Sequence, residues 1–473
     1  MFNENNPMPE EKLWIENHPF AELRVGASAS IQRTLTKADI VLFAKVSGDV
    51  NPAHVDAAYA KTTRFGEIIA HGMLGGALIS MVLGTEFPGP GTIYVSQNLR
   101  FLRPVHPGDT LTVSVTVASL DTEHHRAVLD TRCVDQNGEV VIDGQAEVVP
   151  PKEKLRIHRT ELPDVLLADK NLRYGQLLAA AQQYKPMRMA VVHPCSRDAL
   201  EGAVQAAQLG LIEAVLVGPA EKIRALAAEH QLDIGALPMV DVPHSHAAAQ
   251  KAVAMAQSGE VHALMKGSLH TDELMSEVVA PANGLRTARR ISHIFVLDVP
   301  RYGKPLLVTD AAINIEPDFE AKADIVRNAI DLAHALGIAR PKVAILSAVE
   351  TVNPKMRSSM DAAALCKMVD RGQIVGGVLD GPLAFDNAIS AFAAGIKGIH
   401  SEVAGDADIL VVPNLEAGNM LAKQLEYLAD AQAAGVVLGA KVPIVLTSRA
   451  DSAHSRVASC AVALLAHHHA TKA

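Results

Sequence analysis

The apolar residues of this chain follow two different patterns, one on each side of about residue 170. In the first part, Thr110 to Val117 alternates strictly between polar and apolar side chains, which is typical of a strand with one buried face. From about Leu172 onward, short continuous apolar runs end in polar residues or glycine, and helical segments separate them. Such runs are typical of a mostly parallel sheet covered on both faces. The sequence therefore predicts two domains of different fold class.

The first part combines a buried helix with antiparallel strands. Thr36, with Asp39 three residues later, predicts a helix N-terminus. The apolar segment 68–84 predicts a central helix, and Asn137-Gly138 predicts a hairpin between two later strands. We expect an α+β domain in which an antiparallel sheet curls around the helix.

Four segments follow from these patterns. We expect an N-terminal extension at residues 1–19, the α+β domain at 20–150 and a linker at 151–171, which is charged and begins beside a proline pair. The α/β domain then covers 172–473. We expect it to have two subdomains, one of them formed by about 172–310 together with the C-terminal segment.

Composition excludes some partners. The formal net charge is −9, so no overall basic field favours nucleic acid or an anionic membrane. Segment 68–84 is shorter than a membrane span and contains His71 and four glycines. The four cysteines show no CxxC spacing, and the acidic N-terminus does not resemble a leader sequence. We expect a cytoplasmic protein with no nucleic acid or membrane partner.

The stretch SGDVNPAHVD places Asp49 and His54 on either side of Asn51-Pro52. Near neutral pH, an unperturbed aspartate is a carboxylate and an unperturbed histidine is largely a neutral base. Two such groups held about one water apart can activate that water. Proline fixes φ and so limits the turn between them, while the Asn51 amide can orient a ligand.

This stretch, with AHGMLGGALIS and FLRPVHPGDTLTV, resembles the MaoC-like (R)-specific enoyl-CoA hydratases of hotdog fold over roughly residues 20–150. The resemblance implies that His54 is the general base for water and that Asp49 orients the water and relays its proton. The backbone N–H of Gly72, at a helix N-terminus, suits the thioester carbonyl. His71 is a substrate-binding candidate, with a packed core side chain as the alternative.

The second part carries polar residues where its predicted strands end. It has no GxGxxG and no GxxxxGK[ST] motif, so common nucleotide-binding loops are not indicated. We expect these strand ends to meet and to bind an anion. The candidate cations are Lys266, Arg286, Arg289, Arg290 and Arg449.

Four segments, LMKGSLHTDEL, GLRTARRISH, VTDAAINIEPD and VLTSRADSAHSR, resemble the phosphate acetyl/butyryltransferase family over roughly residues 172–473. The resemblance implies an isopropylmalate dehydrogenase-like fold and acyl transfer between CoA and inorganic phosphate. It implies that Ser448 stabilises the CoA sulfur and that Arg449 holds phosphate. Ser455 stands where acetyl-specific members carry an Asp proposed as base, and Asp451 is the nearest acid. The acyl chain length and any general base therefore stay open. The remaining substrate-binding candidates are Lys266, His270, Arg286, Asp310 and Asn314.

We expect a bifunctional enzyme that uses acyl-CoA and phosphate as substrates, with no metal and no permanently bound cofactor. By resemblance, a homo-oligomer is also expected. Three alternatives stay open. The first domain could be a thioesterase or a dehydratase of another pathway. One of the two domains could be a non-catalytic acyl-CoA-binding or oligomerisation module. The second domain could be a dehydrogenase of the isopropylmalate type.

Overall fold

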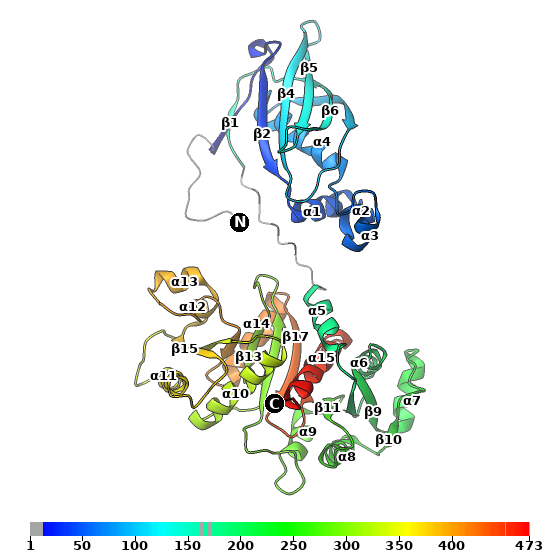
Figure 1. Cartoon of the computed structure of the whole chain (residues 1–473), viewed down its shortest axis with the longest axis vertical. Helices are drawn as coiled ribbons and strands as arrows, with labels where there is room; N and C mark the ends of the chain where they lie inside the picture. Colours follow the sequence, from blue (N-terminus) through cyan, green and yellow to red (C-terminus); the bar gives the residue numbers. More distant parts are fainter. Residues whose placement is uncertain are drawn as a thin grey trace. The chain divides into compact units, whose positions relative to one another are not determined.

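The computed structural model describes residues 13–160, 172–449 and 451–472, together with Leu162, Val165 and Leu167. The chain divides into unit 1, residues 1–167, and unit 2, residues 168–473 (Figure 1). Parts of the expected extension (1–19) and linker (151–171) lie outside the described residues, so the predicted domain bounds stay predictions. Among the described residues, no helix has both the length and the apolar character needed to cross a membrane.

Unit 1 is a five-stranded antiparallel sheet with one helix packed on its concave face. In spatial order the strands are β2 (Ser28–Thr34), β4 (Thr110–Asp121), β5 (Arg126–Val134), β6 (Val140–Val149) and β3 (Ile93–Phe101). The helices are η2 (Phe20–Glu22), α1 (Lys37–Ser47), α2 (Pro52–Val55), α3 (Ala57–Thr62), α4 (Gly72–Met81) and the π-helix η3 (Val82–Glu86). This is the predicted α+β hotdog arrangement.

Glycines allow α4 to lie close to the sheet. A Cβ on Gly75 would stand 2.3 Å from Ile142 Cδ1, and a Cβ on Gly72 would stand 2.9 Å from the Phe101 ring. Alternate residues of β4, including Val113 and Val115, are fully buried in the core beneath this helix. The predicted helix over 68–84 begins only at Gly72, because the N–H groups of Ile69 and Ala70 donate to the carbonyls of Ala53 and Val105 instead of to a helix.

Two local predictions in unit 1 are confirmed. Thr36 caps α1 in a capping box: its side chain accepts from the Asp39 N–H, and the Asp39 side chain accepts from the Thr36 N–H. The turn at Asn137-Gly138 joins β5 and β6, and Gly138 adopts φ of 83°. Each feature depends on a few adjacent residues, so the sequence alone contains the information that specifies it.

Unit 1 also contains a second, two-stranded sheet. Strand β1 (Trp14–Glu16) pairs antiparallel with β7 (Arg156–His158). The buried Asn17 side chain donates to the carbonyls of Pro90 and Glu153, which fixes this sheet to the rest of the unit. The structure therefore places parts of the expected extension and of the expected linker side by side as strands.

Unit 2 is built on an eleven-stranded sheet. In spatial order the strands are β10 (Met239–Asp241), β9 (Ile212–Gly218), β8 (Met187–Val192), β11 (Ala263–Lys266), β18 (Ile444–Val445), β17 (Gln432–Leu438), β12 (Ser292–Asp298), β13 (Leu306–Thr309), β16 (Ile409–Val411), β14 (Lys342–Leu346) and β15 (Val378–Leu383).

The helices of unit 2 cover both faces of this sheet (Figure 1). They are α5 (Leu172–Ala181), α6 (Arg197–Gln208), α7 (Ala220–Glu229), α8 (Ser245–Gln257), α9 (Thr271–Val278), α10 (Phe319–Ala335), α11 (Arg357–Asp370), α12 (Phe385–Ile389), α13 (Ala391–Ile396), α14 (Leu415–Leu428) and α15 (Ala453–Ala470). One hydrophobic core runs along the face covered by α6, α10 and α15, while two separate cores lie on the other face. Residues 168–473 form one compact unit, so the expected division into two subdomains stays a prediction.

Two strands that the sequence did not predict lie at the centre of the sheet and run antiparallel to their neighbours. Strand β17 pairs antiparallel with β18 and β12, and β12 pairs antiparallel with β13. The parallel strands on either side of this pair therefore run in opposite directions. This corrects the expectation that all polar strand ends meet: the carboxyl ends of β11 and β18 lie at one edge, and those of β13, β14 and β16 at the other.

Candidate active sites

The first site is built by a turn that follows α1. This helix ends at Ser47, and Gly48 adopts a left-handed φ of 75°, which directs the chain into the loop that carries Asp49. The Asn51 side chain caps α2 by accepting from the Ala53 N–H. The backbone N–H of Asn51 in turn donates to Asp49 Oδ1 at 3.2 Å. Asn51 therefore shapes the turn, and α2 presents His54 two residues after the proline.

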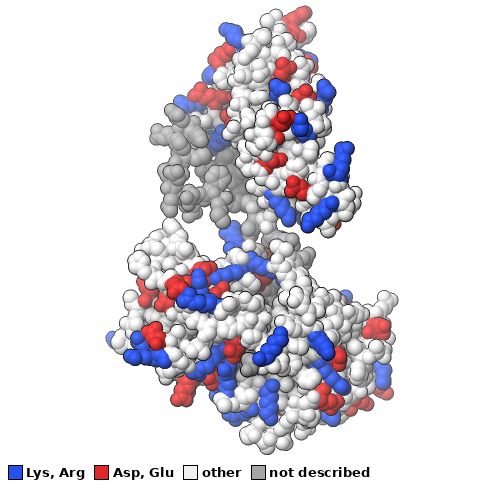
Figure 2. Space-filling model, in the orientation of Figure 1, with Lys and Arg blue, Asp and Glu red and all other residues white. Residues whose placement is uncertain are grey.

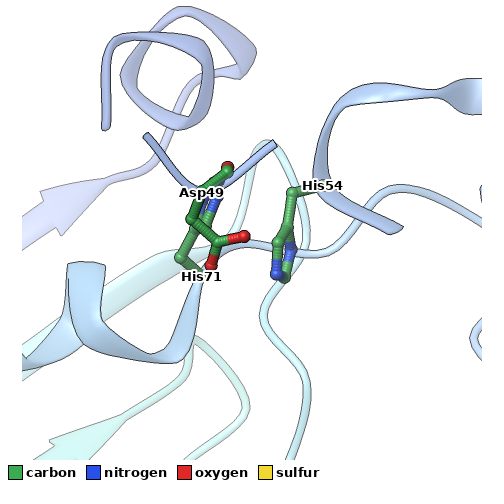
Figure 3. A group of neighbouring side chains, drawn as sticks. All are labelled: Asp49, His54 and His71. Atoms are coloured by element: carbon green, nitrogen blue, oxygen red, sulfur yellow. Dashed lines mark hydrogen bonds between the residues drawn. The ribbon is translucent and has the colours of Figure 1, made fainter. Parts of the chain in front are cut away.

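The surroundings of His54 favour one tautomer of its ring. Its Nδ1 lies 2.8 Å from the carbonyl oxygen of Ile69, which can only accept a hydrogen bond. The proton of the neutral ring is therefore on Nδ1, and Nε2 carries a free lone pair. Asp49 is exposed and His54 is partly buried, and Figure 3 shows the two side chains next to each other.

His71 lies behind this pair and is 3% exposed. Its Nε2 is 3.0 Å from the backbone carbonyl of Asp49, so the ring donates there and holds the Asp49 loop. The His54 and His71 ring centroids are 3.9 Å apart (Figure 3). The Nδ1 of His71 is buried and has no hydrogen-bond partner among the described residues. His71 thus packs against one member of the pair and supports the other.

A cavity of about 530 Å³ opens beside these residues. Asp49, His54 and Gly72 line it, together with apolar side chains such as Phe101 and Leu111. Gly72 is the first residue of α4, so its N–H belongs to the free amino end of the helix. The candidate ligand atoms of Asp49, His54 and His71 all lie within 4.8 Å of one another, close enough to hold a metal ion. Our expectation of no metal therefore stays a prediction.

The second site lies at the carboxyl ends of β11 and β18. Lys266 ends β11 and is 2% exposed, and Ser448 and Arg449 follow β18. The Arg449 guanidinium lies 3.4 Å from His270 Nδ1, and His270 is the N-cap of α9. The structure therefore brings together four residues that were predicted from two separate motifs.

Lys266 has unusual surroundings for a lysine. Its Nζ donates to the carbonyl of Leu269 at 3.1 Å, and no carboxylate of a described residue lies within ion-pair distance. Burial lowers the pKa of Lys266 to about 8, and the positive charges of Arg456 and Arg449 act in the same direction. A buried amine of this kind is a receptive group for an anion, because an anion would stabilise its charged form.

Asp451 belongs to the same turn and is 8% exposed. Its Oδ2 accepts from the Ser448 N–H at 2.7 Å, and its Oδ1 lies 4.0 Å from Lys423 Nζ. Burial raises the pKa of Asp451, although the Ser448 hydrogen bond and Lys423 oppose that rise. Ser455, at the position of the acid that this chain lacks, donates its N–H to the Ser452 hydroxyl in the first turn of α15.

Asp310 and Asn314 form a buried turn after β13. The Asp310 carboxylate accepts from the Asn314 N–H and from the N–H of His293. Asn314 donates to the Ile291 carbonyl and accepts from Arg290 Nε. These contacts bind the amino end of β12 to the carboxyl end of β13, which is a structural task.

Arg286 lies at the opposite edge of the sheet from Ser448. Its backbone pairs with Ala440, which follows the carboxyl end of β17, and β17 runs antiparallel to β18. The side chain is exposed and has no hydrogen-bond or ion-pair partner among the described residues. Arg289 instead pairs with Asp331. The expectation that Arg286 joins Lys266 and Arg449 at one site is therefore not met. Strand β17, which the sequence did not predict, runs antiparallel to β18, so the residues beside its carboxyl end lie at the edge opposite Ser448.

The sequence analysis missed one residue of this site, Arg456. It is fully buried in the first turns of α15, where the next ten residues are buried as well. Its guanidinium donates to the Lys266 carbonyl at 3.2 Å, to the Thr447 hydroxyl at 2.7 Å and to the Ser448 carbonyl at 2.9 Å. The sequence feature that could have indicated its burial is a charged residue in the first turn of a long apolar helix.

The two sites define a two-part enzyme. Unit 1 presents an acid and a base beside a helix amino end, and unit 2 presents cations at strand ends. Comparison with known proteins gives the same division, because residues 24–135 match the MaoC like domain and residues 243–464 match the family Phosphate acetyl/butaryl transferase. The chain belongs to the phosphate acetyl/butyryl transferase family and carries a MaoC-like domain ahead of it.

Individual relatives match one part or the other. The phosphate acetyltransferase of Rhizobium meliloti is 65% identical over 293 residues, which is 62% of this chain and 93% of that protein. A branched-chain phosphotransacylase structure from Enterococcus faecalis V583 is 32% identical, with a TM-score of 0.53, and covers 60% of this chain and 99% of its own. The unliganded R-hydratase PhaJ1 structure from Pseudomonas aeruginosa is 49% identical, with a TM-score of 0.32, and covers 33% of this chain and 99% of its own.

Proposed function

We propose that the chain carries out two reactions on acyl-CoA thioesters. Unit 1 hydrates trans-2-enoyl-CoA to (R)-3-hydroxyacyl-CoA, and unit 2 transfers an acyl group reversibly between CoA and inorganic phosphate. The observation that carries the first activity is the hydrogen bond from His54 Nδ1 to the Ile69 carbonyl, which leaves Nε2 free to accept a proton beside Asp49. The family match of residues 243–464 carries the second activity.

In the proposed hydration, His54 Nε2 takes a proton from water while the water oxygen bonds to the β-carbon of the enoyl group. Asp49 orients the water and relays that same proton from His54 to the α-carbon, so His54 is neutral again and the elements of one water are added across the double bond. The N–H of Gly72 would stabilise the thioester oxygen as negative charge develops there. Asn51 keeps the turn between the two catalytic groups in shape.

In the proposed acyl transfer, a phosphate oxygen attacks the thioester carbonyl and the C–S bond breaks. The phosphate proton ends on the CoA sulfur, so atoms and charge balance. Arg449 and Lys266 would hold phosphate, while the Ser448 hydroxyl would stabilise the leaving sulfur. His270 and Asp451 would keep Arg449 and Ser448 in place through the contacts already described. We propose no such role for Arg286, because it lies at the other edge of the sheet. Asp310 and Asn314 would hold the amino end of β12 in place through their hydrogen bonds to His293 and Ile291.

Acetyl is the acyl group that we propose for the second reaction. The phosphate acetyltransferase relative is 65% identical, whereas the branched-chain phosphotransacylase is 32% identical. The test measures phosphate-dependent release of free CoA from acetyl-, butyryl- and isobutyryl-CoA by the full chain. The highest kcat/KM with acetyl-CoA supports the proposal, and a clear preference for either longer acyl group contradicts it.

We further propose that the protein is a cytoplasmic homo-oligomer whose substrates are acyl-CoA and phosphate, with no permanently bound cofactor and no nucleic acid or membrane partner. Edge strand β3 supports self-association, because it pairs with β6 on one side only and its Ile93 and Phe101 are 63% and 52% exposed. Figure 2 shows acidic and basic side chains interspersed on the face in view. Light scattering of the full chain tests the oligomer, and a monomer would contradict it.

The alternative is that only one unit is catalytic and the other is a binding module. The two assays separate these cases, since the full chain can be tested for hydration of crotonyl-CoA and for phosphate-dependent CoA release in one preparation. Both activities are expected. If one activity is absent across a series of acyl chain lengths, that unit is a binding module.

A further inference from the structure

Arg456 is a buried cation of unit 2 that the proposed reaction leaves unused. It is fully buried, and no carboxylate of a described residue lies within ion-pair distance of its guanidinium. A Cβ on Gly202 of α6 would stand 2.8 Å from Arg456 Cβ, so the stem of the side chain is tightly enclosed. A buried charge without a partner charge is costly, and hydrogen bonds offset that cost only in part here, because the Nε of Arg456 has no hydrogen-bond partner among the described residues.

The hydrogen bonds of Arg456 all go to the ends of two adjacent strands. One nitrogen donates to the Lys266 carbonyl and to the Thr447 hydroxyl, and the other donates to the Ser448 carbonyl. The backbone positions of Lys266 and Ser448 are therefore held by one planar group. Strand β18 has only two residues, so few ladder hydrogen bonds hold the segment that follows it.

We propose, on the basis of the proposed acyl transfer, that Arg456 is a positioning residue that holds the CoA-binding Ser448 and the phosphate-binding Lys266 in one fixed frame. Acyl transfer needs the attacking phosphate oxygen and the bound sulfur at one carbonyl carbon in a defined geometry, so a small displacement of one strand end slows the reaction greatly. Lysine cannot replace this function, because a single ammonium does not reproduce the planar fork of donors.

The charge of Arg456 has a second effect, on the proton affinity of Lys266. After burial, Arg456 is the largest cause that lowers the pKa of Lys266 to about 8. The charged and titratable groups around Lys266 are Arg456 from α15, Arg449 and Asp451 from the loop after β18, and Glu273 and His270 from α9. The positive charges of Arg456 and Arg449 oppose protonation of Lys266, and the negative charges of Asp451 and Glu273 favour it.

This gives a pH dependence with a definite sign. Phosphate binding uses the protonated form of Lys266, which is present below its pKa and is lost as the pH rises through about 8. The Kd of phosphate should therefore increase above that pH in the unchanged protein. Without the charge of Arg456 the pKa of Lys266 is higher, so the increase should begin at a higher pH.

The experiment compares Arg456→Lys and Arg456→Met with the unchanged full chain. Arg456→Lys keeps the charge, so we expect the phosphate pH profile to be retained while the kcat of acyl transfer falls by about 10- to 100-fold. In Arg456→Met the kcat should fall by at least as much, and the increase in the Kd of phosphate should begin at a higher pH. Hydration of crotonyl-CoA by unit 1 of each variant should be unchanged. Arg327→Met is the matched control. The Arg327 guanidinium donates to Asp324 and to the Gln373 carbonyl, so this change removes an arginine of unit 2 that, among the described residues, makes no contact with Lys266 or Ser448.

Calorimetric titration of inorganic phosphate into each protein between pH 7 and 9.5 gives the pH profile without any turnover. If the unchanged chain binds phosphate but releases no CoA, the proposed acyl transfer fails while the titrations still test Arg456. Should Arg456→Met not fold, Arg456→Lys decides. The proposal is overturned if folded Arg456→Lys keeps its full kcat, if folded Arg456→Met keeps the original pH profile, or if the unchanged chain binds no phosphate.

Discussion

The Asp49–His54 site and the Lys266–Ser448 site hold their charged groups in opposite surroundings. In unit 1 an exposed carboxylate and a partly buried ring face a cavity, and both come from one short stretch of chain. In unit 2, Lys266 and Arg456 are buried cations from segments far apart in the sequence, and Arg449 is an exposed cation beside them. The comparison teaches that water activation needs groups that solvent can reach, whereas anion binding benefits from cations that solvent cannot screen.

The largest expected effect tests whether the first site acts alone. Asp49→Asn and His54→Ala should each lower the rate of crotonyl-CoA hydration by about 10³-fold, because each removes a proton-transfer group. Phosphate-dependent CoA release by unit 2 should not change. The loss of enoyl absorbance measures hydration. Asp56→Asn is the matched control, since Asp56 only caps α3 and asparagine caps equally well. Hydration that survives both site changes contradicts the assignment.

The next effect tests which edge of the unit 2 sheet binds phosphate. Arg449→Ala should raise the KM for phosphate by about 10²-fold, because a charge-assisted contact to the anion is lost. Arg286→Ala removes the same side chain at the opposite edge and should leave this KM within about twofold. Steady-state CoA release at varied phosphate measures both. Equal effects of the two changes would place the anion elsewhere.

A smaller effect tests whether the units are separate in stability. A Cβ on Gly144 of β6 would stand 2.1 Å from the Asn98 carbonyl oxygen, and one on Gly435 of β17 would stand 2.5 Å from the Leu446 carbonyl oxygen. Each alanine change should therefore cost about 2–3 kcal/mol in its own unit only. Differential scanning calorimetry should show one transition shifted by each variant.

Gly84→Ala is the control for this pair, because a Cβ there meets no atom within 4 Å. Gly84→Ala should leave both transition temperatures unchanged or raise that of unit 1 slightly. If either strand variant lowers both transitions together, the units unfold as one body and the comparison between them fails.

The smallest effect concerns the capping box of α1. Thr36→Ala removes the acceptor for the Asp39 N–H and should lower the free energy of unfolding of unit 1 by about 1 kcal/mol. Urea unfolding followed by circular dichroism measures this. Thr36→Ser keeps the hydroxyl and should recover most of the loss. A change in hydration activity without a change in stability would contradict a purely structural role for this cap.

The two sites also differ in how far the sequence could predict them. Asp49, His54 and Gly72 lie within one short segment, so their spacing along the chain already limits their spacing in the fold. The role of His71 as a support for the Asp49 carbonyl needed the structure, because it depends on a backbone contact 22 residues away. In unit 1, the sequence therefore predicted the fold class and the residues that the structure brings together, while their catalytic roles stay a prediction.

In unit 2, the same reasoning predicted Lys266, Ser448 and Arg449 but misplaced Arg286. Apolar runs predict that a strand exists and do not give its direction. Strands β12 and β17 escaped prediction, and their antiparallel pairing decides which strand ends share an edge. Arg456 escaped because a lone arginine at a helix start is usually solvated, and only packing against α6 and β18 buries it.

The order of strands in unit 2 also constrains how the protein is made. Strand β18, close to the end of the chain, lies between β11 and β17, and α15 packs beside it. During synthesis the ribosome completes unit 1 long before it reaches this strand. Unit 1 can therefore fold while the rest is still being translated, since domains generally fold as units. The sheet of unit 2 keeps an unfilled position between β11 and β17 until β18 emerges, and nascent chains that stop before β18 should depend on chaperones.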